Sequence, residues 1–207
     1  SGLAQRCTDH GIPVVLFNRE QEDDRLCSVV TDNYLGGQVV ARHLLDCGYQ
    51  RIGYIAGFEE ASTQQQREAG FLDALAEAGV RPVSREVGGL DYARARAASL
   101  EMFAGSDRPD AAFVANDHMA FAVMDALRHK LGLSIPEDVG IVGFDDVPIA
   151  AWPAYDLTSY RQPINRMVDR TVDSIMTRIE DNTLAPERIA IKGELIVRGS
   201  TRKTSET

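Results

Sequence analysis

Residues 135–148 of this chain have the sequence Ile-Pro-Glu-Asp-Val-Gly-Ile-Val-Gly-Phe-Asp-Asp-Val-Pro. Within it, the apolar run 139–144 ends in two adjacent carboxylates, Asp145 and Asp146. This pattern predicts a buried strand whose carboxyl end lies at the edge where open α/β sheets bind their ligands. A carboxylate held there accepts two hydrogen bonds, and vicinal sugar hydroxyls offer that kind of pair. The stretch therefore predicts an α/β fold and the place of a ligand site.

Strand and helix patterns alternate along the rest of the chain. Short apolar runs predict strands, and segments with an apolar side chain every three or four positions predict helices, several of them closed by a glycine. The expected strands lie at residues 13–17, 28–31, 51–57, 85–87, 111–115, 139–144, near 159 and 188–197. The expected helices lie at residues 34–47, 64–78, 92–103, 117–131 and 164–179, with the end of another at 2–11. This alternation predicts an α/β protein with parallel sheets and helices on both faces.

Composition limits the classes of protein that the chain represents. Its 207 residues are enough for one sizeable core or for two small lobes. Lysine and arginine total 22 against 31 aspartate and glutamate residues, so the formal net charge is −9. A DNA-binding surface needs a basic patch, and no segment is dense in lysine or arginine. We therefore expect any contact with DNA to come from a part of the protein outside this sequence.

The cysteines and the hydropathy pattern bear on location and on cofactors. Cys7, Cys27 and Cys47 are odd in number and lack the spacing of metal ligands, which predicts reduced thiols in a cytoplasmic protein. No apolar run approaches the length that spans a membrane, and no signal peptide leads the sequence. We expect no metal, no cofactor and no membrane association.

Two polar positions near helix starts are candidates for ligand contact. Asp32 and Asn33 end one strand and begin a helix, so each is a candidate either for capping the helix or for contacting a ligand. Arg67 lies in the first turns of another helix, across from its apolar stripe. A single helical arginine is most often a solvated surface residue, so its position alone leaves both interpretations open.

Two further candidates follow buried strands directly. Asn116 and Asp117 come after the strand at 111–115 and open the next helix, where asparagine and aspartate are preferred as caps. Capping and ligand contact are compatible here, because one residue can cap while the other points to a cleft. Asp145 has the best functional case on position alone, because a carboxylate that ends a buried strand needs a partner once it is desolvated. Asp146 is expected to be solvated or hydrogen-bonded locally.

Several short motifs occur in one order along the chain. They are Asp-Asn-Tyr-Leu-Gly at 32–36, Arg-Glu-Ala-Gly-Phe at 67–71, Ala-Asn-Asp-His-Met-Ala at 115–120, Gly-Phe-Asp-Asp at 143–146, Leu-Thr-Ser-Tyr-Arg-Gln-Pro at 157–163 and Val-Arg-Gly-Ser-Thr at 197–201. From about Pro13 to Thr201, the chain thus resembles the effector-binding domain of LacI/GalR-type transcriptional regulators. The resemblance implies effector contacts by the residues that stand at the family's binding positions: Arg67, Asn116, Asp145, Asp32 and Gln162.

The resemblance also implies a domain organisation. It predicts two Rossmann-like lobes with parallel sheets, joined by three crossovers, in the manner of type I periplasmic binding proteins. Residues 1–48 are expected to form part of the first lobe, with 163–182 returning to it. Residues 49–162 are expected to form the second lobe, completed by 183–201, and 202–207 to form a tail. The family's helix-turn-helix head and the opening βα units of the first lobe are expected to be missing. Unless it is covered, the resulting sheet edge is an association hazard.

The chain departs from the family at one position of the expected site. Family members often carry an aromatic residue just after the strand near 88–89, where it stacks on the effector. Here that position is Leu90, with Tyr92 two residues later. The departure argues against a purine or pyranose that stacks in the family manner. Leu90 nevertheless remains a predicted ligand-binding position.

Two aromatic residues are candidates for a different surface. Phe121 lies early in the helix after Asn116, and Trp152 lies in the loop at 148–155. Large aromatic side chains are often buried, so a place in the core is one interpretation. In the resembled family these regions face a second subunit, and the resemblance therefore implies a symmetric homodimer that buries both side chains.

The leading functional hypothesis is an effector-sensing domain of a LacI-type regulator. A small, sugar-like metabolite would close the two lobes and thereby control operator binding by the absent head. The alternative is a periplasmic-type sugar-binding protein of a transport system, since fold alone does not separate the two. An enzyme is not expected, because the chain has no nucleophile elbow, no phosphate-binding glycine-rich loop and no histidine pair at metal spacing.

Overall fold

The computed structural model describes residues 2–21 and 23–202, and strands and helices alternate along them. The strands are β1(Val15–Phe17), β2(Cys27–Thr31), β3(Ile52–Ala56), β4(Ser84–Val87), β5(Ala111–Val114), β6(Gly140–Asp145), β7(Thr158–Arg161), β8(Arg188–Ile191) and β9(Glu194–Ile196). The α-helices are α1(Gly2–Asp9), α2(Asn33–Asp46), α3(Ser62–Glu77), α4(Tyr92–Phe103), α5(Asp117–Ala126) and α6(Ile164–Glu180). A π-helical turn, Leu127–Leu131, extends α5, and a 3-10 turn lies at Pro148–Ala151. None of the helices in these described ranges is long and apolar enough to cross a membrane.

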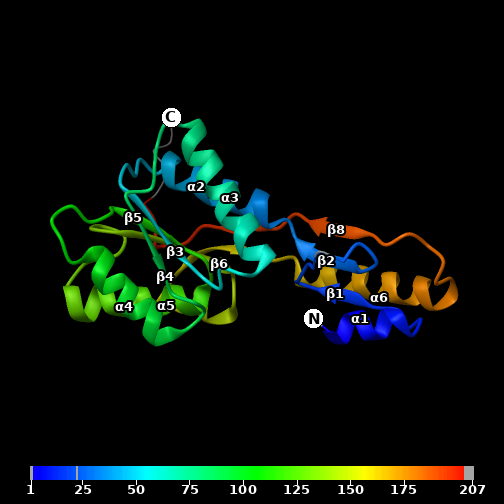
Figure 1. The fold of residues 1–207 in the computed structure, drawn as a ribbon. Coiled ribbons are helices and arrows are strands. Elements are labelled where there is room, and N and C mark those ends of the chain that lie inside the picture. The colour runs from blue at the N-terminus through cyan, green and yellow to red at the C-terminus, as the bar shows by residue number, and fades with distance from the viewer. Residues whose placement is uncertain (1, 22, 203–207) are drawn as a thin grey trace.

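The larger lobe is built on a six-stranded sheet with the order β4-β3-β5-β6-β7-β9. Its neighbouring strands are parallel except for β9, which pairs with β7 in the antiparallel direction. Helices α2 and α3 lie over one face of this sheet, and α4 and α5 lie over the other (Figure 1). Because both faces are covered, the central strands are apolar throughout, and β3 and β5 are buried at every position.

The smaller lobe has a three-stranded parallel sheet with the order β1-β2-β8. Helix α6 packs on β1 and β2, and α1 lies at the same end of the molecule (Figure 1). The core cluster of this lobe consists of Val29, Met167 and Ile191. The expected α/β fold with two lobes of the periplasmic-binding-protein type is therefore present, with a much smaller core in one lobe than in the other.

The position of α2 differs from the predicted boundary at residue 48. Its apolar side chains Val40 and Leu44 are buried in the core of the larger lobe. The reason is a close backbone approach between α2 and α3. A Cβ atom at Gly37 would overlap the carbonyl oxygen of Arg67, and one at Gly70 would overlap the carbonyl oxygen of Tyr34. Glycine at both places lets the two helices touch, so the chain leaves the smaller lobe directly after β2.

The end of the chain also differs from the prediction of one strand at 188–197 in the second lobe. Instead, β8 pairs with β2 in the smaller lobe, while β9 pairs with β7 in the larger one. Gly193 lies at the crossing, where its amide donates to the Tyr160 hydroxyl over 3.0 Å and a Cβ would overlap the carbonyl oxygen of Arg161. The fully buried strand β2 thereby gains a partner on its second edge. Residues 203–207 of the predicted tail lie outside the described residues.

Candidate functional site

A cavity of about 420 Å³ lies where the two lobes meet. The loop after β1, residues 18–21, contributes one wall, and residues 58–64 before and within the start of α3 contribute another. Five of the six residues predicted to bind a ligand line the cavity. Arg67 lies on α3, Asp145 ends β6, and the other three lie in the segments after β4, β5 and β7: Leu90, Asn116 and Gln162. The carboxyl ends of β3, β5 and β6 converge here because all three strands are parallel.

Arg67 is held in the wall of the cavity by contacts on all sides. Although it stands on a helix, its side chain is only 6% exposed. Its Nη2 donates to Oδ1 of Asn33 over 2.8 Å, and its Nη1 donates to the carbonyl oxygen of Ala115. The guanidinium carbon lies 3.4 Å from the centroid of the Phe144 ring, a cation–π contact. The close packing of α2 on α3 therefore brings Asn33 to a position where it orients the arginine.

The Nε atom of Arg67 differs from the two Nη atoms in its contacts. Its Nε is buried and has no hydrogen-bond partner among the described residues. An unpaired buried donor costs about 1–3 kcal/mol, and more for a charged group. Burial lowers the pKa of Arg67, while the nearby carboxylate of Asp145 opposes that shift. The site thus holds a fixed cation next to an anion, with a donor still to be satisfied.

Asp145 ends β6 and belongs to a hydrogen-bonded chain that crosses between the lobes. Its Oδ1 accepts from Nε2 of Gln162 over 2.6 Å, and Oε1 of Gln162 accepts from Oγ1 of Thr31 over 2.8 Å. Thr31 is the last residue of β2 in the smaller lobe. Burial raises the pKa of Asp145, and Arg67 and the hydrogen bond from Gln162 oppose the rise. A change in the angle between the lobes would therefore disturb the orientation of this carboxylate.

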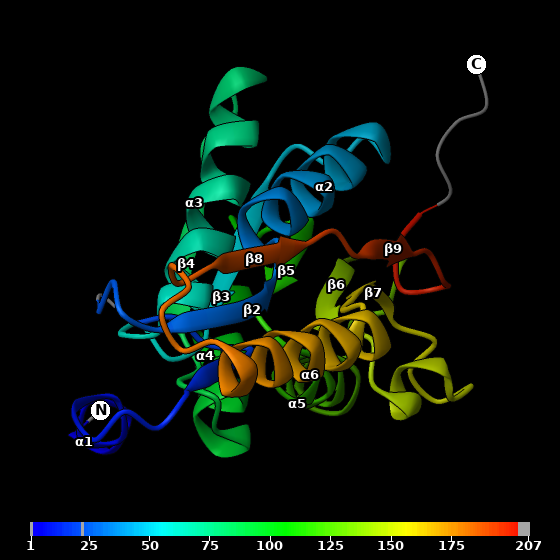
Figure 2. The ribbon, with the colours of Figure 1, turned by 90° about the vertical axis from the view of Figure 1, so that its right-hand side faces the viewer.

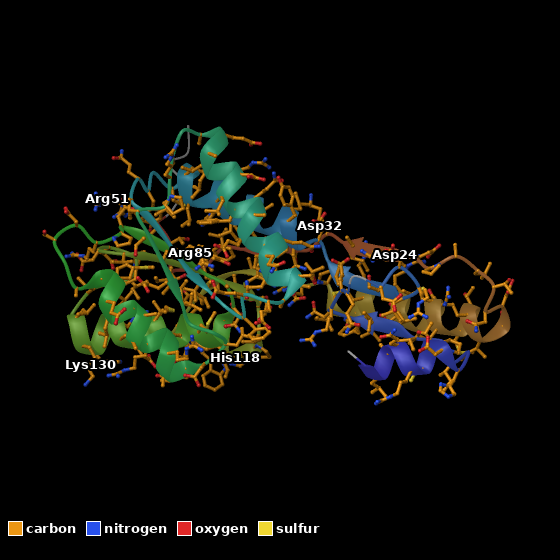
Figure 3. All side chains as sticks on the ribbon, in the orientation of Figure 1. Asp24, Asp32, Arg51, Arg85, His118 and Lys130 are labelled. Carbon is orange, nitrogen blue, oxygen red and sulfur yellow. The ribbon has the colours of Figure 1, made fainter. Side chains whose placement is uncertain are left out.

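Asn116 and Asp32 both cap helices, with different relations to the cavity. Oδ1 of Asn116 accepts from the amide of Met119 over 2.9 Å, and the residue also lines the cavity. Oδ1 of Asp32 accepts from the amide of Leu35 over 2.9 Å. Within the described part of the chain, Asp32 does not line the cavity, and Figure 3 shows it at the junction of the lobes. For Asp32 the capping interpretation accounts for the observed contacts, and Asn33 makes the contact with Arg67.

Backbone strain collects around the cavity. Leu90, 54% exposed, has φ +61°, Asn18 has φ +52°, and Asp145 has φ +120°. All three line the cavity. Non-glycine residues in the left-handed region cost about 1–3 kcal/mol each and cluster at functional sites, where surrounding contacts hold them. The position of Leu90 agrees with its predicted place in the site.

The wall from the smaller lobe is not among the predicted site residues. Oε2 of Glu20 accepts from Nε2 of Gln66 over 2.6 Å, and its carbonyl oxygen accepts from Oγ of Ser62 over 3.4 Å. The loop after β1 therefore touches the first turns of α3. One signal would have found it. Asn18, Arg19 and Glu20 directly follow a strand, as Asn116 and Asp145 do, and the same rule on carboxyl ends applies to them.

The two aromatic residues predicted at a subunit interface have different environments. Phe121 is 6% exposed, and its ring centroid lies 4.4 Å from that of Tyr155. Trp152 is 55% exposed. Both line a second, surface depression, to which Leu90 and Tyr92 also belong. Packing within the chain therefore explains the burial of Phe121, whereas Trp152 is an exposed apolar side chain.

The chain matches one protein-family model, described as a periplasmic binding protein-like domain, over residues 41–201. It is 28% identical over 193 residues to the HTH-type transcriptional repressor PurR of Photobacterium profundum. The aligned region covers 92% of this chain and 58% of the repressor. The chain thus spans less than two thirds of the length of this curated relative.

Solved structures agree with this match. A transcriptional regulator CelR–cellobiose complex is 31% identical, with a TM-score of 0.88, over 96% of this chain and 62% of that one. A LacI transcriptional regulator from a Rhodococcus species has a TM-score of 0.89 over 99% of this chain and 74% of that one, and at 23% identity it supports the fold alone. The chain belongs to the periplasmic binding protein-like domain family and corresponds to the effector-binding region of LacI-type transcriptional repressors.

Proposed function

We propose that the chain is the effector-sensing domain of a LacI-type, DNA-binding transcriptional regulator. The observation that carries the proposal is the cavity between the lobes, where Arg67 is fixed by the larger lobe, Asp145 is linked through Gln162 to the smaller one, and one buried arginine donor lacks a partner among the described residues. The matched relatives are transcriptional repressors, which favours a regulator over the solute-binding protein of a transport system and over an enzyme. A cytoplasmic location follows from this function.

The effector that suits the site is a small polyhydroxylated metabolite. Arg67 supplies donors in a rigid plane, Asp145 supplies acceptors, and Asn116 supplies one of each kind. Every hydroxyl of a sugar needs such a partner once water is excluded, and about 420 Å³ falls in the usual size range of small-molecule sites. The cellobiose complex of a 31% identical regulator supports the sugar class. Gln162 and Leu90 complete the proposed binding set.

Lobe closure is the proposed output of binding. The Thr31–Gln162–Asp145 chain links β2 of the smaller lobe to β6 of the larger one, and the loop at 18–21 reaches the start of α3. A ligand that bridges both lobes binds the closed state more tightly and shifts the population toward it. In the full regulator, the partners are a second copy and operator DNA contacted through a helix-turn-helix head. With a net charge of −9, these 207 residues alone are expected to leave operator DNA unbound.

The test screens the protein for thermal stabilisation by pentoses, hexoses and disaccharides, cellobiose included, and measures any hit by titration calorimetry. Arg67→Ala and Asp145→Ala are each expected to weaken binding of the hit by at least about 100-fold, because loss of a buried charged partner costs about 3–5 kcal/mol. Arg51→Ala and Asp24→Ala are the matched controls. They remove an exposed arginine and an exposed aspartate, neither of which lines the cavity, and are expected to retain full affinity.

The outcomes separate the alternatives. Retained affinity in Arg67→Ala or Asp145→Ala, with the fold intact by circular dichroism, would remove that residue from the site. If no carbohydrate stabilises the protein, the sugar class is wrong. Turnover of a bound ligand that disappears in Asp145→Asn would instead establish an enzyme.

A further inference from the structure

Behind the candidate site lies a second carboxylate that the proposed ligand contacts do not use. Asp117, the first residue of α5, is completely buried. Its Oδ1 accepts from Oγ of Ser159 over 2.6 Å, and its Oδ2 accepts from the amide of Val147 over 2.9 Å. Gly143 on β6 makes room for it, because a Cβ there would overlap Oδ1 of Asp117. A buried carboxylate thus lies against the strand that ends in Asp145.

These contacts fix a strained turn. Asp145 and Asp146 both have left-handed backbone angles, with φ values of +120° and +56°. The amide of Asp146 donates to Oγ of Ser159 over 3.1 Å, while the next amide, that of Val147, donates to Asp117. Ser159 therefore connects Asp117 to the turn by donating to one and accepting from the other. Two consecutive strained residues persist only where their surroundings hold them, and this pair of contacts does so.

Charged groups lie near Asp117 on the turn, on α5 and on α3. Asp145 and Asp146 lie on the turn, and His118 follows on α5, where it faces Asp145. Arg67 on α3 acts on Asp117 from the cavity side. The carboxylate of Asp146 is itself neutralised by two arginines, Arg161 on β7 at 2.6 Å and Arg198 after β9 at 2.7 Å.

The ionised form of Asp117 does not serve to stabilise the fold. Burial raises the pKa of Asp117 to about 7 from an ordinary value of 3.8, and the two neighbouring carboxylates add to the rise. A raised pKa means that the folded protein holds this proton more tightly than the unfolded chain does. The stability contributed is therefore complete below pH 3.8 and is lost as the pH rises through about 7. Some other requirement must account for a buried aspartate here.

We propose that Asp117 is a positioning residue that sets the orientation of the Asp145 carboxylate according to its own protonation state. The ionised carboxylate holds the turn in two ways: it accepts from the amide of Val147 directly, and it accepts from the hydroxyl of Ser159, whose Oγ in turn accepts from the amide of Asp146. When it takes up a proton on Oδ1 it donates to Oγ of Ser159 instead of accepting from it, so the amide of Asp146 shares that oxygen with a second donor and its hydrogen bond weakens. Effector affinity then depends on pH across neutrality. This consequence rests on the proposed function, since Asp145 is the ligand contact.

The test needs no ligand and follows backbone amides by nitrogen-15 NMR between pH 5.5 and 8.5. In the wild-type chain, the amide resonances of Asp146 and Val147, together with the Asp145 carboxyl resonance followed by carbon-13 NMR, are expected to shift with one midpoint near pH 7. In Asp117→Asn, the amide resonances are expected to stay flat over this range, near the positions of the low-pH wild-type form. His118→Gln is the essential control, because a histidine titrates in the same range, with an ordinary pKa of about 6.5.

A second variant separates positioning from a general structural role. Ser159→Ala keeps the carboxylate but breaks its link to Asp146, so the shift at Asp146 is expected to vanish while that at Val147 remains. This variant also serves if Asp117→Asn does not fold. Wild-type amides without a common midpoint, or a midpoint that persists in Asp117→Asn and disappears in His118→Gln, would overturn the proposal. Neither outcome depends on whether any sugar binds, so failure here and failure of the proposed function are distinguishable.

Discussion

The larger lobe covers its six-stranded sheet with helices on both faces, whereas the smaller lobe has three strands with α6 packed along them. Figure 2, which looks onto the smaller lobe, shows α6 running beside β2 and β8. Within the described part of α6, Met167 is the buried residue, while a stripe along the same helix is about half exposed: Val168, Val172, Met176 and Ile179. An amphipathic pattern therefore predicts a helix reliably, whereas the burial of its apolar face depends on what packs against it.

The same contrast applies to the cores. In the larger lobe, the aromatic side chains of Tyr54, Phe71 and Phe113 form one cluster with centroids 5.1–5.5 Å apart. In the smaller lobe the core cluster consists of Val29, Met167 and Ile191, with Val15 and Ile189 packed against it. We expect the larger lobe to set the global free energy of unfolding and the smaller one to open locally at lower cost.

The largest effect is expected from Phe113→Ala. Phe113 is fully buried on the central strand β5, and removing its ring leaves a cavity against Tyr54 and Phe71. The free energy of unfolding, measured by urea denaturation, is expected to fall by about 3–5 kcal/mol. Phe17→Ala, on β1 of the smaller lobe and 41% exposed, is the matched control and should cost less than about 1 kcal/mol. Equal losses would remove the distinction between the lobes.

A smaller and local effect is expected from Met167→Ala. This side chain is fully buried under β2, where its sulfur lies 3.3 Å from Oγ1 of Thr31. The free energy of local opening, measured by native-state hydrogen exchange at β2 and β8 amides, is expected to fall by about 2 kcal/mol while β5 amides stay protected. Met176→Ala, on the same helix and 51% exposed, should change neither. A matching loss at β5 would mean that the lobes unfold as one unit.

The smallest effect on folding is expected from substitutions of exposed apolar side chains. Trp152→Ser should change the free energy of unfolding by less than about 0.5 kcal/mol. If a second copy covers the depression that Trp152 shares with Tyr92, however, it should shift sedimentation-equilibrium profiles from dimer toward monomer. Val172→Ser on α6 is the matched control, being 52% exposed against 55% for Trp152. A monomeric wild-type chain would refute the dimer, and a shift in the control alone would move the interface to the smaller lobe.

The candidate site was predictable where one rule applied, that polar residues at the carboxyl ends of parallel strands converge. That rule located Asn116 and Asp145, and the family resemblance added Arg67, Gln162 and Leu90, all of which line the cavity. The same rule covers Asn18 to Glu20, which the prediction overlooked. Asp32 was placed by a motif, and its local hydrogen bond to the Leu35 amide gives it a capping role. The difference between Asp32 and Asn33 depends on which side chain α3 approaches, and no local pattern contains that information.

Local patterns by themselves determined the α/β class and the bounds of most elements, because periodicity and glycine stops act over a few residues. They also placed the helix at 164–179, while the crossover before it was implied by the family resemblance. Only the tertiary structure decided that α2 packs on α3 through Gly37 and Gly70, that the last strand pattern divides at Gly193 between two sheets, and that Asp117 is buried behind the Asp145 turn. Each of these features depends on contacts between segments that are distant in sequence. Their free energies are set by how closely the backbones approach and by the loss of water from buried polar groups.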